Sequence, residues 1–164
     1  HMIVNVKDAV RRTRQHHAIE HATLHILAGR YPGRRMAGYS DPGGFTIFGN
    51  LTEDTVRRAV SDAMLRLQAG ESGLAIHANC GTNLAVTGVL ATLAVLLGSA
   101  GRQRDPLGRF TGGLLFVIPA LVVSQPLGLR LQQYTTLASV SDRWVKGIRP
   151  LALAGIPALR VDFD

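Results

Sequence analysis

Residues 84–100, LAVTGVLATLAVLLGSA, and residues 110–129, FTGGLLFVIPALVVSQPLGL, decide the fold of this 164-residue chain. No Asp, Glu, Lys or Arg occurs between Glu71 and Arg102, and each apolar run is about long enough to cross a hydrocarbon core as a helix. The charged, turn-rich residues 101–109 join the two runs. The pattern predicts a transmembrane helical hairpin, and a buried hairpin in a soluble core is the alternative.

Two features of the runs predict how the hairpin is built. Small side chains would let two membrane helices approach closely, and the runs contain Gly88, Ala91, Thr92, Gly112 and Gly113. Pro119 and Pro126 would kink or end the second helix, which membrane helices tolerate. Arginines flank the hairpin on both sides, so the positive-inside rule leaves the orientation open.

Composition limits the choice of partners. The mean hydropathy is positive although the formal net charge is +7, and most of the basic residues are arginines. These arginines are scattered, no aromatic residues interleave with them, and no nucleic-acid motif appears. Anionic lipid headgroups are therefore a more economical partner than nucleic acid. The single cysteine, Cys80, excludes an intrachain disulfide and fits a reducing compartment.

The densest chemical signal is residues 16–25, HHAIEHATLH, which hold four of the six histidines. On a helix, His17, Glu20, His21 and His25 share one face. Residues 17–21 also form the H-x-x-E-H pattern of inverzincins. Two histidines one turn apart can chelate zinc or another divalent transition metal, and the glutamate can act as general base on a water molecule that the metal activates. The alternative is a polar helix face with local hydrogen bonds.

A second cluster, residues 77–83 (HANCGTN), lies where a predicted strand meets the first apolar helix. Three interpretations stay open. His77, which we prefer, or Cys80 supplies the missing third metal ligand. Alternatively, Cys80 is a nucleophile whose pKa is lowered by the helix end and by His77. Finally, Thr82 and Asn79 merely cap the helix.

The remaining elements predict an α+β fold with a small polar domain, a two-helix transmembrane hairpin and a C-terminal β-hairpin. Asp41 lies in an Asp-Pro-Gly stretch and is either an acidic ligand or a turn residue. We expect helices over residues 7–29 and 52–70, a loop over 31–44, and strands at 45–48, 74–77, 144–149 and 156–161. The expected parts are residues 3–83, 84–129 and 130–164.

The stretches HHAIEHATLHIL, SDPGGFTIFGN and AIHANCGTNLAVTG, with the paired apolar runs, resemble an uncharacterised family of small bacterial membrane proteins classed as a domain of unknown function. This resemblance implies a multi-pass protein of the bacterial inner membrane and no particular activity. The local resemblance to inverzincin peptidases covers one helix. In those peptidases a downstream glutamate is the third ligand, and Glu71 is the acid in a comparable position here.

Together these observations predict a membrane-anchored metal-dependent hydrolase, with a peptide as one candidate substrate. His17, His21, His77 and His25 are the candidate ligands of zinc or another divalent transition metal, and Glu20 and Cys80 are the candidate catalytic residues. Membrane lipids are the expected partners, and the hairpin could mediate a homo-oligomer. The alternatives are a non-catalytic membrane protein with a structural metal or histidine cluster, and a Cys80-dependent enzyme.

Overall fold

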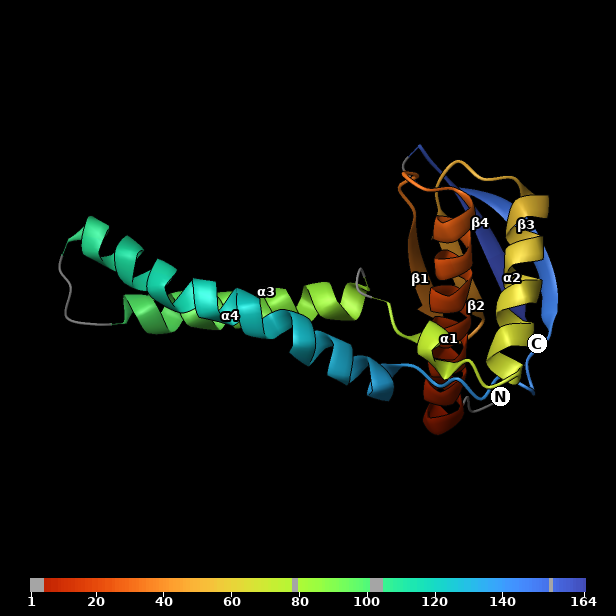
Figure 1. The fold of residues 1–164 in the computed structure, drawn as a ribbon, viewed down its shortest axis with the longest axis horizontal. Helices are drawn as coiled ribbons and strands as arrows, with labels where there is room; N and C mark the ends of the chain where they lie inside the picture. The colour runs from red at the N-terminus through yellow and green to blue at the C-terminus, as the bar shows by residue number, and fades with distance from the viewer. Residues whose placement is uncertain (1–4, 78–79, 101–104, 154) are drawn as a thin grey trace. The chain divides into compact units, whose positions relative to one another are not determined.

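The computed structural model describes residues 5–77, 80–100, 105–153 and 155–164. The chain divides into an α+β unit, residues 1–77 and 134–164, and a helical unit, residues 78–133 (Figure 1). In chain order the elements are α1 (Val6–Arg30), β1 (Ala37–Asp41), β2 (Gly44–Phe48), α2 (Glu53–Gln68), the 3-10 helix η1 (Ser72–Ala75), α3 (Gly81–Ser99), α4 (Pro106–Thr135), β3 (Val145–Leu153) and β4 (Ile156–Phe163). The predicted α+β class is confirmed.

The α+β unit is a four-stranded antiparallel sheet in the order β1-β2-β4-β3. Helices α1 and α2 cover the same face of this sheet (Figure 1). The core between helices and sheet is apolar, and Ile19, Leu27, Phe45, Val60 and Val161 are at most 1% exposed. Burial of this surface is the main stabilising contribution, at about 25 cal/mol per Å² of apolar area. The core therefore holds α1, which carries the histidines, firmly against the sheet.

Local signals set the start of α2, and the C-terminal β-hairpin forms as predicted. The Thr52 side chain caps α2 by accepting a hydrogen bond from the Thr55 amide, and Glu53 and Asp54 lie in the first turn, where acids favour the positive end of the helix. Strands β3 and β4 form the predicted β-hairpin, and Gly155 near its turn has a φ of 77°. A positive φ favours glycine at that position.

Two predictions about the polar part are wrong. Residues 37–41, predicted as loop, form the edge strand β1. All five of its residues are at least partly exposed, and its sequence AGYSD shows no apolar alternation that would have indicated a strand. Residues 74–77, predicted as a strand, are not paired in the sheet, and residues 72–75 form the 3-10 helix η1 instead. The carbonyl groups of Ala75 and Ile76 bond to histidine side chains of α1.

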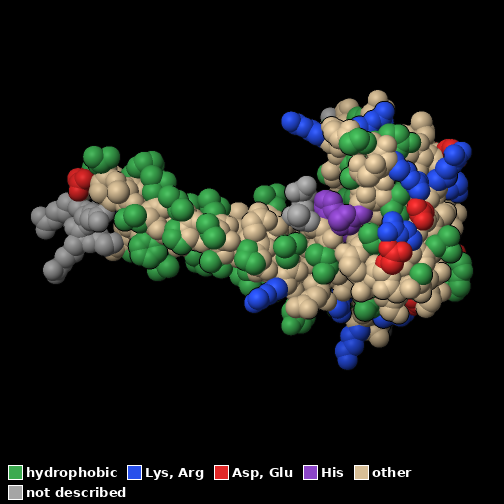
Figure 2. All heavy atoms as spheres, in the orientation of Figure 1, with side chains coloured by type: hydrophobic (Ala, Val, Ile, Leu, Met, Phe, Trp, Pro, Cys, Tyr) green, Lys and Arg blue, Asp and Glu red, His purple; other side chains and the backbone are tan. Residues whose placement is uncertain are grey.

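The two apolar runs form α3 and α4, as predicted. Both helices are long and apolar enough to cross a membrane. Helix α4 continues through Pro119 and Pro126, so neither proline ends it. Large apolar side chains, including Leu97, Leu115 and Val122, are exposed on the unit, and Figure 2 shows apolar side chains along it. The part of the predicted loop at residues 101–104 lies outside the described residues.

Inside the helical unit, close packing involves Gly112 and Gly113 of α4, as predicted, but their neighbour in α3 is Gly98 rather than Gly88. A Cβ atom placed on Gly98 would lie 2.8 Å from the Cα of Gly113 and would also overlap the backbone of Gly112, whereas one on Gly88 would meet nothing within 4 Å. Polar bonds accompany this packing: the Asn83 amide donates to Gln125 at 2.9 Å, and the hydroxyls of Thr87 and Ser124 are 3.0 Å apart. Helices α3 and α4 are thus held together by a glycine contact and a polar seam.

Candidate metal centre

Helix α1 brings the predicted metal-binding histidines together with His77. The ring centroids of His17 and His21 are 4.3 Å apart, those of His21 and His77 are 5.9 Å apart, and those of His25 and His77 are 4.7 Å apart. Spacings of four residues place His17, His21 and His25 on successive turns. Figure 2 shows histidine side chains gathered at one place on the surface of the α+β unit. We call these four residues the histidine cluster.

Backbone carbonyl groups orient two rings of the cluster. The Nδ1 atom of His17 lies 3.1 Å from the carbonyl oxygen of Thr135, and the Nδ1 atom of His21 lies 2.7 Å from that of Ala75. A carbonyl oxygen only accepts, so Nδ1 carries the proton in both rings and donates it. In the neutral imidazoles the lone pair is therefore on Nε2, and this is the arrangement that supports metal ligation by histidine.

His21 has a buried ring nitrogen that a metal ion could satisfy. The residue is 1% exposed, and among the described residues its Nε2 atom has no hydrogen-bond partner, a feature that it shares with Nε2 of His16. A buried polar atom without a partner is unfavourable by about 1–3 kcal/mol. A metal ion bound to Nε2 would satisfy this atom.

The spacing of the rings also fits one metal ion. Two imidazoles on a tetrahedral zinc ion, with Zn–N bonds of about 2.0–2.1 Å, have their ring centroids roughly 5 Å apart. The distances of 4.3 Å from His17 to His21 and 5.9 Å from His21 to His77 bracket this value. Each of these two pairs of rings therefore has a spacing near the one that a shared zinc ion requires.

Glu20, the predicted general base, is fixed against the sheet. Its carboxylate is buried, and Oε2 accepts a hydrogen bond from the Ser40 hydroxyl at 2.6 Å. Gly38 on the same strand leaves room for it, because a Cβ atom there would lie 2.7 Å from Cγ of Glu20. On α1, Glu20 is about 60° around the helix axis from His17, on the side away from His21. No sequence pattern indicated this niche in β1.

The other candidate catalytic residue, Cys80, belongs to the helical unit. It is the N-cap of α3, where its sulfur accepts a hydrogen bond from the Thr82 amide at 3.4 Å. The cap is therefore Cys80 rather than Thr82, and Asn79 lies outside the described residues. His77, three residues earlier, ends the first segment of the α+β unit.

The two acids considered as further ligands are each paired with an arginine. Arg160 donates to both carboxylate oxygens of Asp41 at 2.7 and 2.8 Å, and this lowers the pKa of Asp41 below its usual value. The Asp41 carboxylate also accepts from the Gly43 amide, which is the turn role considered for it. Glu71 accepts from Arg66, which lowers the pKa of Glu71.

His16 is a core residue and not a member of the cluster. It is fully buried, stacks on Phe163 with ring centroids 4.8 Å apart, and donates from Nδ1 to the carbonyl oxygen of Asp41 at 2.9 Å. Burial lowers the pKa of His16, so the neutral form is favoured. The H-x-x-E-H pattern, which starts at His17, already separated this histidine from the candidate ligands.

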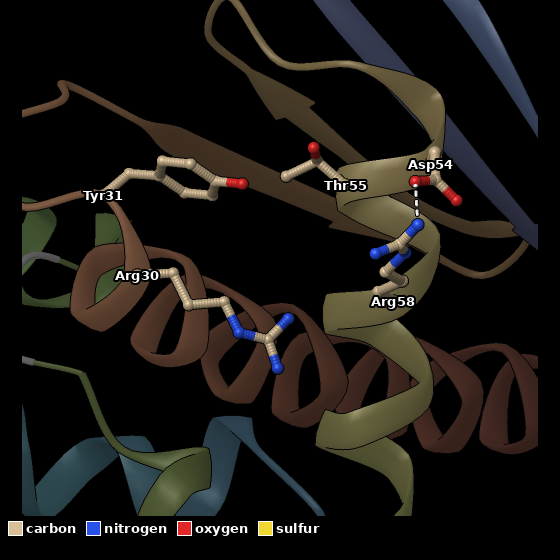
Figure 3. Close-up of a pocket in the computed structure, with 5 residues that line it drawn as sticks. All are labelled: Arg30, Tyr31, Asp54, Thr55 and Arg58. Atoms are coloured by element: carbon tan, nitrogen blue, oxygen red, sulfur yellow. Dashed lines mark ion pairs between the residues drawn. The ribbon is translucent and has the colours of Figure 1, made fainter.

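A pocket between the end of α1 and the start of α2 was not indicated by the sequence. It is lined by Arg30, Tyr31, Asp54, Thr55 and Arg58 (Figure 3). Arg58 is paired with Asp54 at 2.7 Å, and Arg30 is paired with Asp62 at 2.7 Å. Because both cations already have a carboxylate partner, the pocket offers no uncompensated charge to a ligand.

Fold and site thus define a class of protein: an α+β unit with a histidine cluster, joined to two helices of membrane-spanning length. Residues 12–148 match the family described as DUF6391, a domain of unknown function, and the chain belongs to this family. The predicted membership of an uncharacterised family is confirmed, whereas the resemblance to inverzincins stays a prediction.

The chain is also similar to an uncharacterized protein of Picosynechococcus sp. strain PCC 7002. The two sequences are 38% identical over 135 residues, which are 76% of this chain and 65% of that protein. The chain therefore spans just under two thirds of the length of this relative. No solved structure matches the chain.

Proposed function

We propose that this protein is a membrane-anchored metal-dependent hydrolase. Zinc, or another divalent transition metal, binds to Nε2 of His17 and His21, and His77 is the third protein ligand. Glu20 is the general base. Two observations support the proposal. Backbone carbonyl groups fix the tautomers of His17 and His21, and the buried Nε2 atom of His21 lacks a hydrogen-bond partner among the described residues.

His17, His21 and His77 would hold the ion. Zinc with three protein ligands would supply a bound water molecule whose pKa is lowered to about 7. The carboxylate of Glu20 would be the group that accepts the proton of this water. Its hydrogen bond from Ser40 limits the rotamers of Glu20, which supports a positioned base. A peptide near the membrane surface is the proposed substrate.

The helical unit supplies the proposed location. We propose that α3 and α4 cross the bacterial inner membrane, which makes the protein multi-pass and gives it membrane lipids as partners. Their length, their hydropathy and their exposed apolar side chains support this location. A homo-oligomer through the hairpin is compatible with it, and nucleic acid is not a proposed partner. A carbonate wash of cell membranes should leave the full chain in the pellet, and its release as soluble protein would contradict the location.

The metal site is tested by isothermal titration of the full chain with zinc in detergent. We expect one ion per chain, and His21→Ala should abolish binding because two remaining ligands hold zinc poorly. His16→Gln is the matched control, since His16 lies in the core and should not change the stoichiometry. Zinc binding by His21→Ala as tight as that of the unaltered chain would contradict the site.

The hydrolytic role is tested with Glu20→Gln on a mixture of fluorogenic peptides. This change keeps the shape of the side chain and removes the proton acceptor, so kcat should fall by about 10²–10⁴-fold while zinc content is unchanged. Cys80→Ser should be mild. If Glu20→Gln retains turnover and Cys80→Ser abolishes it, the protein is a thiol enzyme. If zinc is bound and no peptide is cleaved, the metal site is structural and the hydrolase proposal is wrong.

A further inference from the structure

The histidine cluster holds the backbone where the chain leaves the α+β unit. This unit's first segment ends at residue 77. Nδ1 of His21 donates to the carbonyl oxygen of Ala75 at 2.7 Å, and Nε2 of His25 donates to that of Ile76 at 2.8 Å. His77 follows directly and lies against the rings of both histidines. We call residues 72–77 the exit segment; two histidines of α1 bond to its carbonyl groups, and its last residue, His77, contacts both of their rings.

The same face of α1 holds the backbone where the chain returns, at residue 134. Nδ1 of His17 donates to the carbonyl oxygen of Thr135 at 3.1 Å. One turn earlier on the helix, the Arg14 side chain donates to the carbonyl oxygen of Thr136, and the Leu137 amide donates to the carbonyl oxygen of Arg14 at 2.9 Å. We call residues 134–137 the return segment.

The proposed metal ligands are therefore also the groups that anchor both connections to the helical unit. A metal ion on Nε2 withdraws electrons from the ring, which makes the Nδ1 proton a stronger donor to its carbonyl partner. A metal bond to His77 would tie the exit segment to α1 directly. Opening of either segment would in turn move a ligand or its hydrogen-bond partner out of place.

We propose that metal occupancy of the histidine cluster controls the local stability of the exit and return segments, and so regulates how the α+β unit is tethered to the hairpin. The inference rests on the metal site of the proposed function and does not require hydrolysis. The ion binds only when both segments are bonded to α1. By mass action it therefore raises the free energy that is needed to open either segment. At a zinc concentration 100 times Kd, opening becomes about 100-fold rarer.

Hydrogen exchange of the full chain in detergent, read by mass spectrometry, tests this regulation. With zinc sulfate in place of EDTA, amides of the exit and return segments should exchange up to about 100-fold more slowly. Suitable reporters are the amides of Leu74 and Ile76, which are bonded within η1 and its cap, and the amide of Leu137. Peptides from β4 should exchange equally in both conditions, and they also show that each variant is folded.

Two variants separate the metal bond from the hydrogen bonds. His77→Ala should remove the effect of zinc on both segments, because the two remaining ligands hold zinc poorly. His25→Ala should speed exchange with and without zinc, because the bond to Ile76 is lost, and should leave the ratio between the two conditions unchanged. Loss of the zinc effect in His25→Ala but not in His77→Ala would overturn the assignment of His77.

The possible failures are distinguishable. If titration shows one zinc per chain and neither segment is protected, the regulatory inference is wrong and the metal site stands. If zinc does not bind at all, the metal site is wrong as well. Protection spread evenly over β4 and both segments would mean global stabilisation by the ion and would also overturn local control.

Discussion

The contact between α3 and α4 at Gly98 can be tested with a pair of matched glycine substitutions. Gly88 lies in the middle of α3 and Gly98 in its last turn, and alanine is favoured over glycine in a helix interior by about 1 kcal/mol. This gain applies to Gly88→Ala in full and to Gly98→Ala at most in full. Only the methyl group at residue 98 would overlap the backbone of Gly112 and Gly113. The two variants therefore differ chiefly in the packing contact.

Overpacking of a well-packed interface costs about 1–3 kcal/mol, so Gly98→Ala should be less stable than Gly88→Ala by that amount. The assay is an SDS titration of the full chain in micelles, with hydrogen exchange of α3 peptides as the readout. Gly88→Ala should resist SDS as well as or better than the unaltered chain. Equal midpoints for the two variants would refute the packing of α3 on α4 through Gly98.

Three further predictions concern the α+β unit. Arg160→Gln should lower the free energy of unfolding by about 1.5–3 kcal/mol, measured by urea titration, because charged hydrogen bonds to Asp41 and Asp162 are lost. Arg160→Lys should recover only part of this free energy, since lysine cannot bind a carboxylate in a bidentate manner. Full recovery by Arg160→Lys would contradict a role for the bidentate geometry. Asp41 has a lowered pKa in the folded state, so its contribution to stability is present above its unfolded pKa of about 3.9 and is lost as the pH falls further. The urea midpoint should therefore decrease below pH 4, and it should decrease less steeply with pH in Arg160→Gln. Equal pH dependence in the two proteins would argue against the ion pair of Asp41 and Arg160. Gly38→Ala should destabilise the unit because its methyl group would overlap Glu20, whereas Gly29→Ala meets nothing within 4 Å and should be neutral or stabilising in the same assay.

The sequence predicted the parts of the fold that periodicity and capping determine. The apolar runs that became α3 and α4 and the cap at Thr52 follow from local chemistry. The edge strand β1 was missed because its side chains are mostly half-exposed and its pairing with β2 is a tertiary event. Residues 74–77 resemble a strand by composition, yet the histidines of α1 compete for the carbonyls of Ala75 and Ile76.

The candidate site was predictable in its residue types and not in its surroundings. Helical spacing alone places His17 and His21 on one face. The Ser40 bond to Glu20 depends on how β1 lies against α1, and the carbonyl partners of the histidines come from distant parts of the chain. No local pattern in the sequence carries that information.

The central claim is a metal ion held by three imidazoles, and X-ray absorption at the zinc K-edge of the zinc-loaded full chain tests it most directly. The account predicts a first shell of nitrogen and oxygen at about 2.0–2.1 Å with scattering from three imidazole rings. His77→Ala should lose the ion, because the two remaining ligands hold zinc poorly. A first shell dominated by sulfur at about 2.3 Å, or zinc without imidazole scattering, would contradict the claim.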